Sequence, residues 1–199
     1  MKYALEVIAR ERCFNGFLKL VSYRLRHSLF AGGWSHAIER ERIERLNAVA
    51  AILYDAIRDR IVMVEQFRIG ALEHGRGAWT LEPVGGILNR GERADEAVKR
   101  EALEEAGLEI QELEHIATYH VSPGVSADRI RLFCGLVDAE KAVGIHGIKG
   151  EGEETRVRVI DAEHAISGLY SGSIDVSSAI IGVQWLASNR DRLRVEWNR

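Results

Sequence analysis

The sequence predicts an α/β protein with one main domain. Its 199 residues are enough for one well-buried domain but not comfortably for two. The composition, 46% hydrophobic and 29% charged, is typical of an ordinary soluble globular protein with a hydrophobic core. Short apolar runs of β type are interspersed with segments rich in Ala, Glu and Leu, so strands and helices mix along the chain.

The first 45 residues are expected to form an N-terminal β arm. They are rich in Arg and Glu, and apolar side chains alternate in residues 3–8 and again around 17–25. Such alternation is typical of half-buried strands. We therefore divide the chain into an arm, residues 1–45, and a main domain, residues 46–199.

The main domain begins with a predicted antiparallel hairpin. Two compact β-type runs, 48–54 and 61–67, are joined by the polar stretch 55–60. Residues 79–84 form another short strand candidate, which ends in Pro83 and the pair Gly85-Gly86. These residues break regular structure, so we expect a loop to open there.

Residues 92–106 form the clearest helix candidate. They contain no Gly or Pro and are filled with strong helix formers, and Gly107 supplies a C-terminal cap. A Gly-rich loop is expected at 144–152. The remaining predicted elements are strands at 113–121, 129–137 and 155–160 and helices at 162–170 and 176–188.

Charge and apolar patterning exclude two classes of partner. The formal net charge is -3, so there is no overall positive field of the kind that draws proteins onto nucleic acid. The longest apolar run, residues 48–54, is far too short to span a membrane, and the N-terminus does not resemble a signal peptide. Cys13 and Cys134 lack metal-ligand spacing. Their scarcity indicates a reducing, cytoplasmic location.

Three glutamates of the predicted helix face the same way. At 100° per residue, Glu101, Glu104 and Glu105 occupy an arc of about 100°. Their like charges repel one another unless a positive group lies among them. Carboxylate oxygens suit Mg²⁺ or Mn²⁺, whereas no His and Cys set for zinc is present. The alternative is a solvated acidic helix face.

The spacing around this helix resembles the Nudix hydrolase signature at every fixed position. Gly86 is followed after five residues by Glu92 and after seven more by the pair Arg100-Glu101. The pair Glu104-Glu105 follows after two residues, then Gly107 and the aliphatic Leu108. The resemblance implies an α/β/α sandwich with a mixed sheet and helices on both faces.

Each position of this Nudix box carries an expected role. The resemblance implies that Glu101, Glu105 and Glu104 bind the metal, with Glu105 also counted among the catalytic residues. Gly85 is expected to offer its carbonyl oxygen to that metal. We expect four residues to be structural: Glu92, Arg100, Gly86 and Gly107. Of these, Glu92 and Arg100 are expected to form an ion pair that holds the loop against the helix.

Further motifs are similar to the ADP-ribose pyrophosphatase branch of this family. They are Gln66-Phe67-Arg68, Glu82-Pro83 and Ser122-Pro123-Gly124. The resemblance implies substrate-binding roles for Arg68, Glu82, Pro123 and, from the arm, Arg40. Arg68 and Glu82 can equally form salt bridges at the edge of the site, and Arg40 can simply belong to a packed arm. In that branch the arm helps to form a homodimer.

Two loop glutamates complete the implied site. By position, Glu151 matches the residue that acts as the base for the attacking water, and Glu153 matches a neighbouring metal ligand. The alternative is that both are ordinary solvated loop charges. The residues leave open which glutamate has which role.

The predicted function is Mg²⁺-dependent hydrolysis of ADP-ribose to AMP and ribose 5-phosphate, with Mn²⁺ as an alternative metal. Two alternatives stay open: hydrolysis of another nucleoside diphosphate sugar such as GDP-mannose, and a non-catalytic module that senses ADP-ribose. The sequence leaves open the number of metals, the phosphorus that is attacked and the dimer geometry.

Overall fold

A computed structural model describes residues 3–44, 47–147 and 154–197. By its internal contacts the chain divides into two compact units. The arm unit comprises the described residues up to Asn47 together with His120–Arg129, and the main unit comprises Ala48–Tyr119 with the described residues from Ile130 onward. Within the described ranges, no helix has the length and apolar character needed to cross a bilayer.

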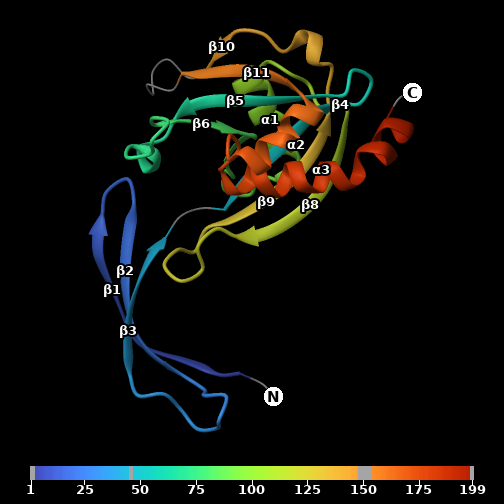
Figure 1. Cartoon of the computed structure of the whole chain (residues 1–199). Coiled ribbons are helices and arrows are strands. Elements are labelled where there is room, and N and C mark those ends of the chain that lie inside the picture. The colour runs from blue at the N-terminus through green and yellow to red at the C-terminus, as the bar shows by residue number, and fades with distance from the viewer. Residues whose placement is uncertain (1–2, 45–46, 148–153, 198–199) are drawn as a thin grey trace. The chain divides into compact units, whose positions relative to one another are not determined.

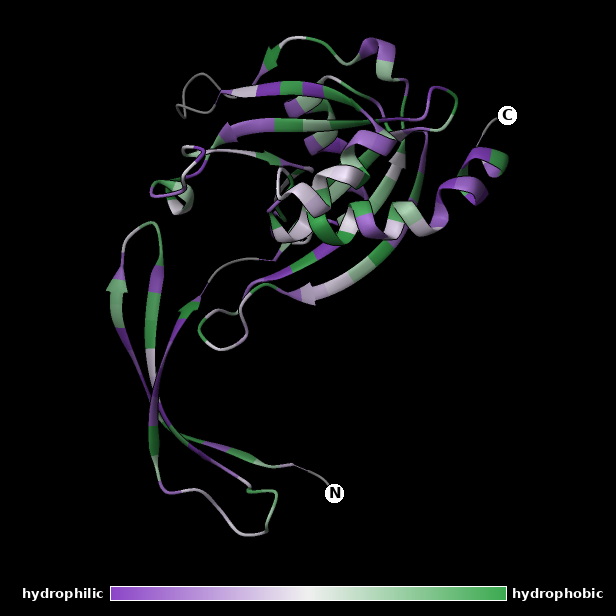
Figure 2. Ribbon diagram, viewed as in Figure 1, coloured by the Kyte–Doolittle hydropathy of each residue, from purple (hydrophilic) through white to green (hydrophobic). Residues whose placement is uncertain are grey.

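The arm unit is built on a three-stranded antiparallel sheet (Figure 1). Its strands, in spatial order, are β1 (Leu5–Asn15), β2 (Lys19–His27) and β3 (Ile38–Glu44). Hydrophobic and hydrophilic residues intermingle along β1 and β2 (Figure 2), and every residue of β1 is exposed. The structure forms strands where the alternation predicts them, but the expected half-burial is wrong for β1. The Arg- and Glu-rich β3 was not predicted because its composition lacks a β signal.

The main unit contains a mixed sheet in the order β10-β11-β5-β4-β9-β8, with β6 paired to β5 and β7 paired to β4. The β4 and β9 strands run parallel, whereas β4 pairs antiparallel with β5 and β7. The strands are β4 (Ala48–Asp55), β5 (Arg60–Phe67), β6 (Trp79–Glu82), β7 (Val84–Ile87), β8 (Glu112–His120), β9 (Arg129–Leu136), β10 (Ile145–His146) and β11 (Thr155–Asp161).

Helices cover both faces of this sheet. On β4, Ala51 and Leu53 pack with the apolar side of α1 (Ala94–Ala106), whereas Ile52 and Tyr54 pack with α2 (Ala162–Ser171) and α3 (Ser177–Glu196). Such alternation follows from the two-residue period of a strand. Figure 1 shows α2 and α3 together on one side of the sheet. The predicted α/β/α sandwich with a mixed sheet is confirmed.

The predicted loop at Gly85-Gly86 is wrong, because Val84–Ile87 forms strand β7. It pairs with β4 from Ala51↔Val84 to Ala48↔Ile87. A Cβ on Gly85 would lie 2.4 Å from the carbonyl oxygen of Val49, so only glycine permits this approach. Residues that usually break strands therefore serve here to bring two backbones together.

Two other elements differ from expectation. Helix α3 continues to Glu196, beyond the predicted end at residue 188, because no Gly or Pro stops it. A two-residue strand, β10, lies within the predicted Gly-rich loop and pairs with the start of β11. The predicted cap is confirmed, since Gly107 ends α1 in the left-handed region with φ of 65°.

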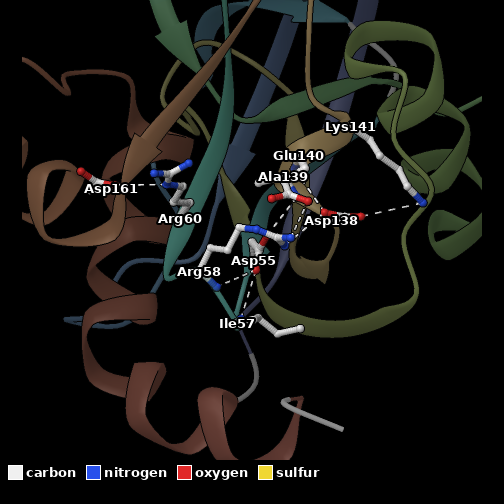
Figure 3. A network of polar contacts seen from close by, with 9 residues as sticks. All are labelled: Asp55, Ile57, Arg58, Arg60, Asp138, Ala139, Glu140, Lys141 and Asp161. Carbon is white, nitrogen blue, oxygen red and sulfur yellow. Dashed lines mark hydrogen bonds and ion pairs between the residues drawn. The ribbon is translucent and has the colours of Figure 1, made fainter.

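The turn between β4 and β5 is held by a polar network centred on Asp55 (Figure 3). The Asp55 carboxylate is 1% exposed and accepts hydrogen bonds from the backbone N–H groups of Ile57, Arg58 and Ala139. The Arg58 guanidinium also donates to Asp55 at 3.0 Å and pairs with Asp138. The network ties this turn to the segment that follows β9.

Candidate active site

Helix α1 presents its three acidic residues with different degrees of burial. Glu101 is buried, Glu105 is half-buried and Glu104 is exposed. The side of α1 next to these residues, which includes Val98 and Ala102, packs in the core. The helix thus places its acidic edge at the margin of the core, as its sequence period predicts.

Arg100 organises the carboxylates around it. Its Nε donates to Glu92 Oε1 at 3.0 Å, which confirms the predicted ion pair. Its Nη1 donates both to Glu101 Oε1 at 2.8 Å and to Glu104 Oε2 at 2.9 Å. One guanidinium therefore joins the loop before α1 to two glutamates of the helix, and the forked geometry of Arg permits this.

Glu105 is oriented by a backbone group. The N–H of Gly85 donates a hydrogen bond to Glu105 Oε2 at 2.8 Å. This contact fastens the end of α1 to strand β7 and fixes the direction of the carboxylate. The structure thus brings Gly85 and Glu105 together, while the role of the Gly85 carbonyl as a metal ligand stays a prediction.

Gly86 lies against Glu101. A Cβ built on Gly86 would lie 2.0 Å from Glu101 Oε1 and 2.6 Å from Oε2. A side chain at position 86 is therefore incompatible with the observed position of the carboxylate. The Gly86 of the box serves Glu101 directly, in addition to allowing β7 to pass close to α1.

A second polar group lies across the ends of β5 and β6. Arg68 and Glu82 form a two-pronged ion pair, with Nε to Oε1 and Nη2 to Oε2 both at 2.9 Å. Thr80 Oγ1 also donates to Glu82. Of the two interpretations left open by the sequence, the salt bridge between Arg68 and Glu82 is observed, and a substrate contact by either residue stays a prediction.

The electrostatics of the site favour a positive charge beside the glutamates. Burial raises the pKa of Glu105 to about 7, against the opposing hydrogen bond from Gly85, and the neighbouring Glu101 raises it further. Burial also raises the pKa of Glu101, which Arg100 partly offsets. The Arg100 guanidinium, by contrast, lowers the pKa of Glu92. Two desolvated carboxylates without equal compensating charge are a common feature of functional sites.

The donor set suits a hard divalent cation. Glu101, Glu104 and Glu105 offer only oxygen ligands, and the burial of two of them is relieved by a cation. In the ranges 3–44, 47–147 and 154–197, however, no three acidic, His or Cys side chains converge as a ready metal cage. Glu101 and Glu104 are directed at Arg100 instead, and Glu105 is directed at Gly85.

Four predicted site residues lie in the other unit or outside the described residues, so their relation to this group is not tested. Arg40, on β3, and Pro123, in the turn that begins at Ser122, belong to the arm unit. Arg40 Nη1 donates to the backbone oxygen of Glu39. Glu151 and Glu153 lie outside the described residues. The functional roles of these four stay predictions.

This geometry is consistent with comparisons to known proteins. The NUDIX domain model matches residues 44–172, well over half of the chain and the whole of the glutamate helix with its preceding glycines. This chain belongs to the Nudix family. Glu101, Glu104, Glu105 and the Arg100 cluster are thus parts of a Nudix box.

Relatives cover almost all of the chain. It is 39% identical over 196 residues to the ADP-ribose pyrophosphatase of Escherichia coli strain K12, covering 98% of this chain and 94% of the relative. The ADP-ribose pyrophosphatase of Haemophilus influenzae is 38% identical, with 98% and 91% covered. The GDP-mannose pyrophosphatase of Salmonella typhimurium is 27% identical, with 76% of this chain and 78% of the relative covered.

A solved structure supports the fold. The crystal structure of an ADP compounds hydrolase has a TM-score of 0.72 against this chain and covers 96% of it and 95% of the solved chain, at 16% identity. At that identity the similarity concerns the fold alone.

Two residues around the Nudix box were not predicted from the sequence. Thr80 lies two residues before Glu82 on β6, so the two-residue period of a strand would have placed it beside that carboxylate. His146 lies against the helix cap, since a Cβ on Gly107 would be 2.9 Å from its Cε1. No local signal pairs residues so distant in sequence.

Proposed function

We propose that this Nudix protein hydrolyses the diphosphate bond of ADP-ribose to AMP and ribose 5-phosphate. The observation that carries this proposal is the similarity to ADP-ribose pyrophosphatases along 98% of the chain, arm included. The similarity to GDP-mannose pyrophosphatases is lower and covers 74–76% of the chain. Water supplies the oxygen that joins one phosphorus as the bond from that phosphorus to the bridging oxygen breaks.

The proposed cofactor is a divalent metal ion, Mg²⁺ with Mn²⁺ as the alternative. Glu101, Glu104 and Glu105 would hold it, together with the Gly85 carbonyl and Glu153. When bound, such an ion neutralises charge on the diphosphate and lowers the pKa of a bound water. The chemistry of the described donor set supports this assignment, and the desolvation of Glu101 and Glu105 supports it further.

The chain's own groups have separate tasks in the proposed reaction. Arg100 holds Glu101 and Glu104 in place, and the Gly85 N–H holds Glu105. Glu151 is proposed to take the proton from the attacking water. Arg68 and Glu82, already joined to each other, are proposed to contact the substrate from the ends of β5 and β6.

A substrate screen tests this function. The purified protein, with Mg²⁺, is incubated with ADP-ribose, other ADP-sugars, GDP-mannose, NADH and diadenosine polyphosphates, and products are separated by chromatography. We expect preferred turnover of ADP-ribose to AMP. Preferred turnover of GDP-mannose would contradict the substrate assignment, and tight ADP-ribose binding without turnover would indicate a sensor.

A matched pair of variants on α1 tests the site. Glu101→Gln removes the charge of the buried carboxylate, and we expect activity to fall at least about 100-fold, as for lost electrostatic groups in active sites. Glu96→Gln removes an exposed charge of the same helix and should retain activity. Full activity of Glu101→Gln at saturating Mg²⁺ would refute the assignment.

We also propose that the arm forms a homodimer. Strand β1 of the three-stranded arm sheet exposes Leu5, Val7 and Phe14, and a second copy of the chain can cover these apolar side chains. Light scattering after size-exclusion chromatography should give twice the chain mass, and Val7→Glu should shift the mass towards that of one chain. A monomeric native protein would contradict this.

We propose a cytoplasmic location. Cys13 and Cys134 are both free, which supports it.

A further inference from the structure

Gln66 carries a buried hydrogen-bond donor that has no role in the proposed reaction. Its side chain is only 6% exposed, and no residue in the described part of the chain accepts a hydrogen bond from its Nε2. Burying an amide N–H without an acceptor costs free energy, so buried N–H groups in native proteins are almost always hydrogen-bonded. Gln66 therefore points to an acceptor that arrives with a ligand.

The strand register places this donor on the face that carries the Nudix box. On β5, Val62 and Val64 pack in the core that includes α1. Side chains alternate along a strand, so Gln66 projects from the same face two residues further on. Its neighbours across the sheet are Thr155 on β11 and Thr80 on β6.

The charged groups nearest along that face are acceptors or are already paired. Glu82 lies two residues beyond Thr80 on the same strand and binds both Thr80 and Arg68. Glu105 accepts a hydrogen bond from the N–H of Gly85 on β7, which pairs with β4 beside β5. The amide of Gln66 is thus a neutral donor on the strand face that also carries Glu82, whose register partner on β5 is Val64.

We propose that Gln66 Nε2 donates a hydrogen bond to an oxygen of the bound diphosphate. This inference rests on the proposed function for its ligand class. Phosphate oxygens are acceptors only, whereas ribose hydroxyls can also donate and are matched by Glu82. A neutral amide binds such an oxygen without adding a positive charge that competes for the Nudix carboxylates.

The test compares ligands with and without a diphosphate. Gln66→Met keeps the volume and removes the donor, Gln66→Glu puts an acceptor in its place, and Gln184→Met is the control on an exposed face of α3. The dissociation constants of ADP and AMP are measured by calorimetry with Mg²⁺, together with KM and kcat for ADP-ribose. Melting temperatures report on folding.

We expect Gln66→Met to weaken ADP binding and raise KM for ADP-ribose by about 10- to 100-fold, as for a lost hydrogen bond to a charged acceptor. Gln66→Glu should weaken ADP binding and raise KM for ADP-ribose further. In both variants the dissociation constant of AMP should change little. Equal loss for ADP and AMP, loss for ADP-ribose alone, or no loss at all would each overturn the proposal. The ADP measurement needs no turnover, so failure of native protein to hydrolyse ADP-ribose would refute the proposed function without deciding this one.

Discussion

Gly86 and Glu101 leave no room for a side chain between them, since a Cβ on Gly86 would lie 2.0 Å from Glu101 Oε1. The obstacle is the far end of a side chain, so Gly86→Ala displaces the carboxylate rather than the backbone. We expect kcat/KM for ADP-ribose to fall at least about 100-fold. The free energy of unfolding should change by less than about 1 kcal/mol.

Steady-state kinetics and urea denaturation check this prediction together. Gly70→Ala serves as the control, because a Cβ there meets nothing within 4 Å and its φ is not positive. Native-like activity of Gly86→Ala would show that the position of Glu101 is unimportant for turnover.

Substitution of the neighbouring Gly85 should lower the stability of the fold, in contrast to Gly86→Ala. A Cβ on Gly85 would lie 2.4 Å from the Val49 carbonyl oxygen and 3.0 Å from Ala50 Cα, and both are backbone atoms of β4. Gly85→Ala must therefore separate β7 from β4, and we expect a loss of about 1–3 kcal/mol in the free energy of unfolding. A urea denaturation midpoint equal to that of the native protein would show that β7 can move away from β4 without loss of stability.

The two adjacent glycines show which features of the site the sequence alone predicts. The box spacing predicts that Gly86 and Glu101 belong to one site, because family spacing carries long-range information. It does not predict that Val84–Ile87 forms a strand, since that strand exists through pairing with β4, more than 30 residues earlier. Local propensity at Gly85-Gly86 indicates a loop, and tertiary pairing overrides it.

The same reasoning applies to the polar contacts. The pairing of Arg100 with Glu92 was predicted from the helix and its preceding loop. The salt bridge between Arg68 and Glu82 was one of two alternatives, because sequence alone shows neither strand register nor side-chain direction. That the Gln66 amide has no acceptor within the described residues was beyond prediction, since it requires knowing both its burial and its neighbours.

Arg100 should be sensitive even to replacement by lysine. Its Nε and Nη1 atoms donate to Glu92, Glu101 and Glu104, and a single ammonium group cannot reproduce this fork. We expect Arg100→Lys to lower kcat/KM about 10- to 100-fold and to raise the Mg²⁺ concentration needed for half-maximal activity. Mg²⁺ titrations of turnover measure both quantities.

The control for Arg100→Lys lies at the start of the same helix. Arg93 is 71% exposed and pairs with Asp95, so Arg93→Lys should leave turnover and the Mg²⁺ requirement within about two-fold of native. Similar losses in the two variants would mean that general helix charge, rather than the Arg100 fork, supports activity.

The buried Asp55 of the β4–β5 turn predicts a pH dependence of stability. Burial alone would raise the pKa of Asp55, but hydrogen bonds from the Arg58 and Ala139 N–H groups and from the Arg58 side chain outweigh it and lower the pKa. A carboxyl with a lowered folded pKa stabilises the fold above its unfolded pKa of about 3.9. That contribution is lost as pH falls through the folded pKa.

Asp55→Asn should therefore lower the free energy of unfolding at pH 7 by about 2–3 kcal/mol, because it turns a charged acceptor into an amide facing several N–H donors. Between about pH 5 and pH 3 the native protein should lose stability more steeply than the variant. Urea denaturation at pH 7, 5, 4 and 3 measures both. Asp161→Asn, which removes the charge of the exposed pair with Arg60 shown in Figure 3, should match the native protein. Parallel pH profiles for native protein and Asp55→Asn would place the acid-sensitive group elsewhere.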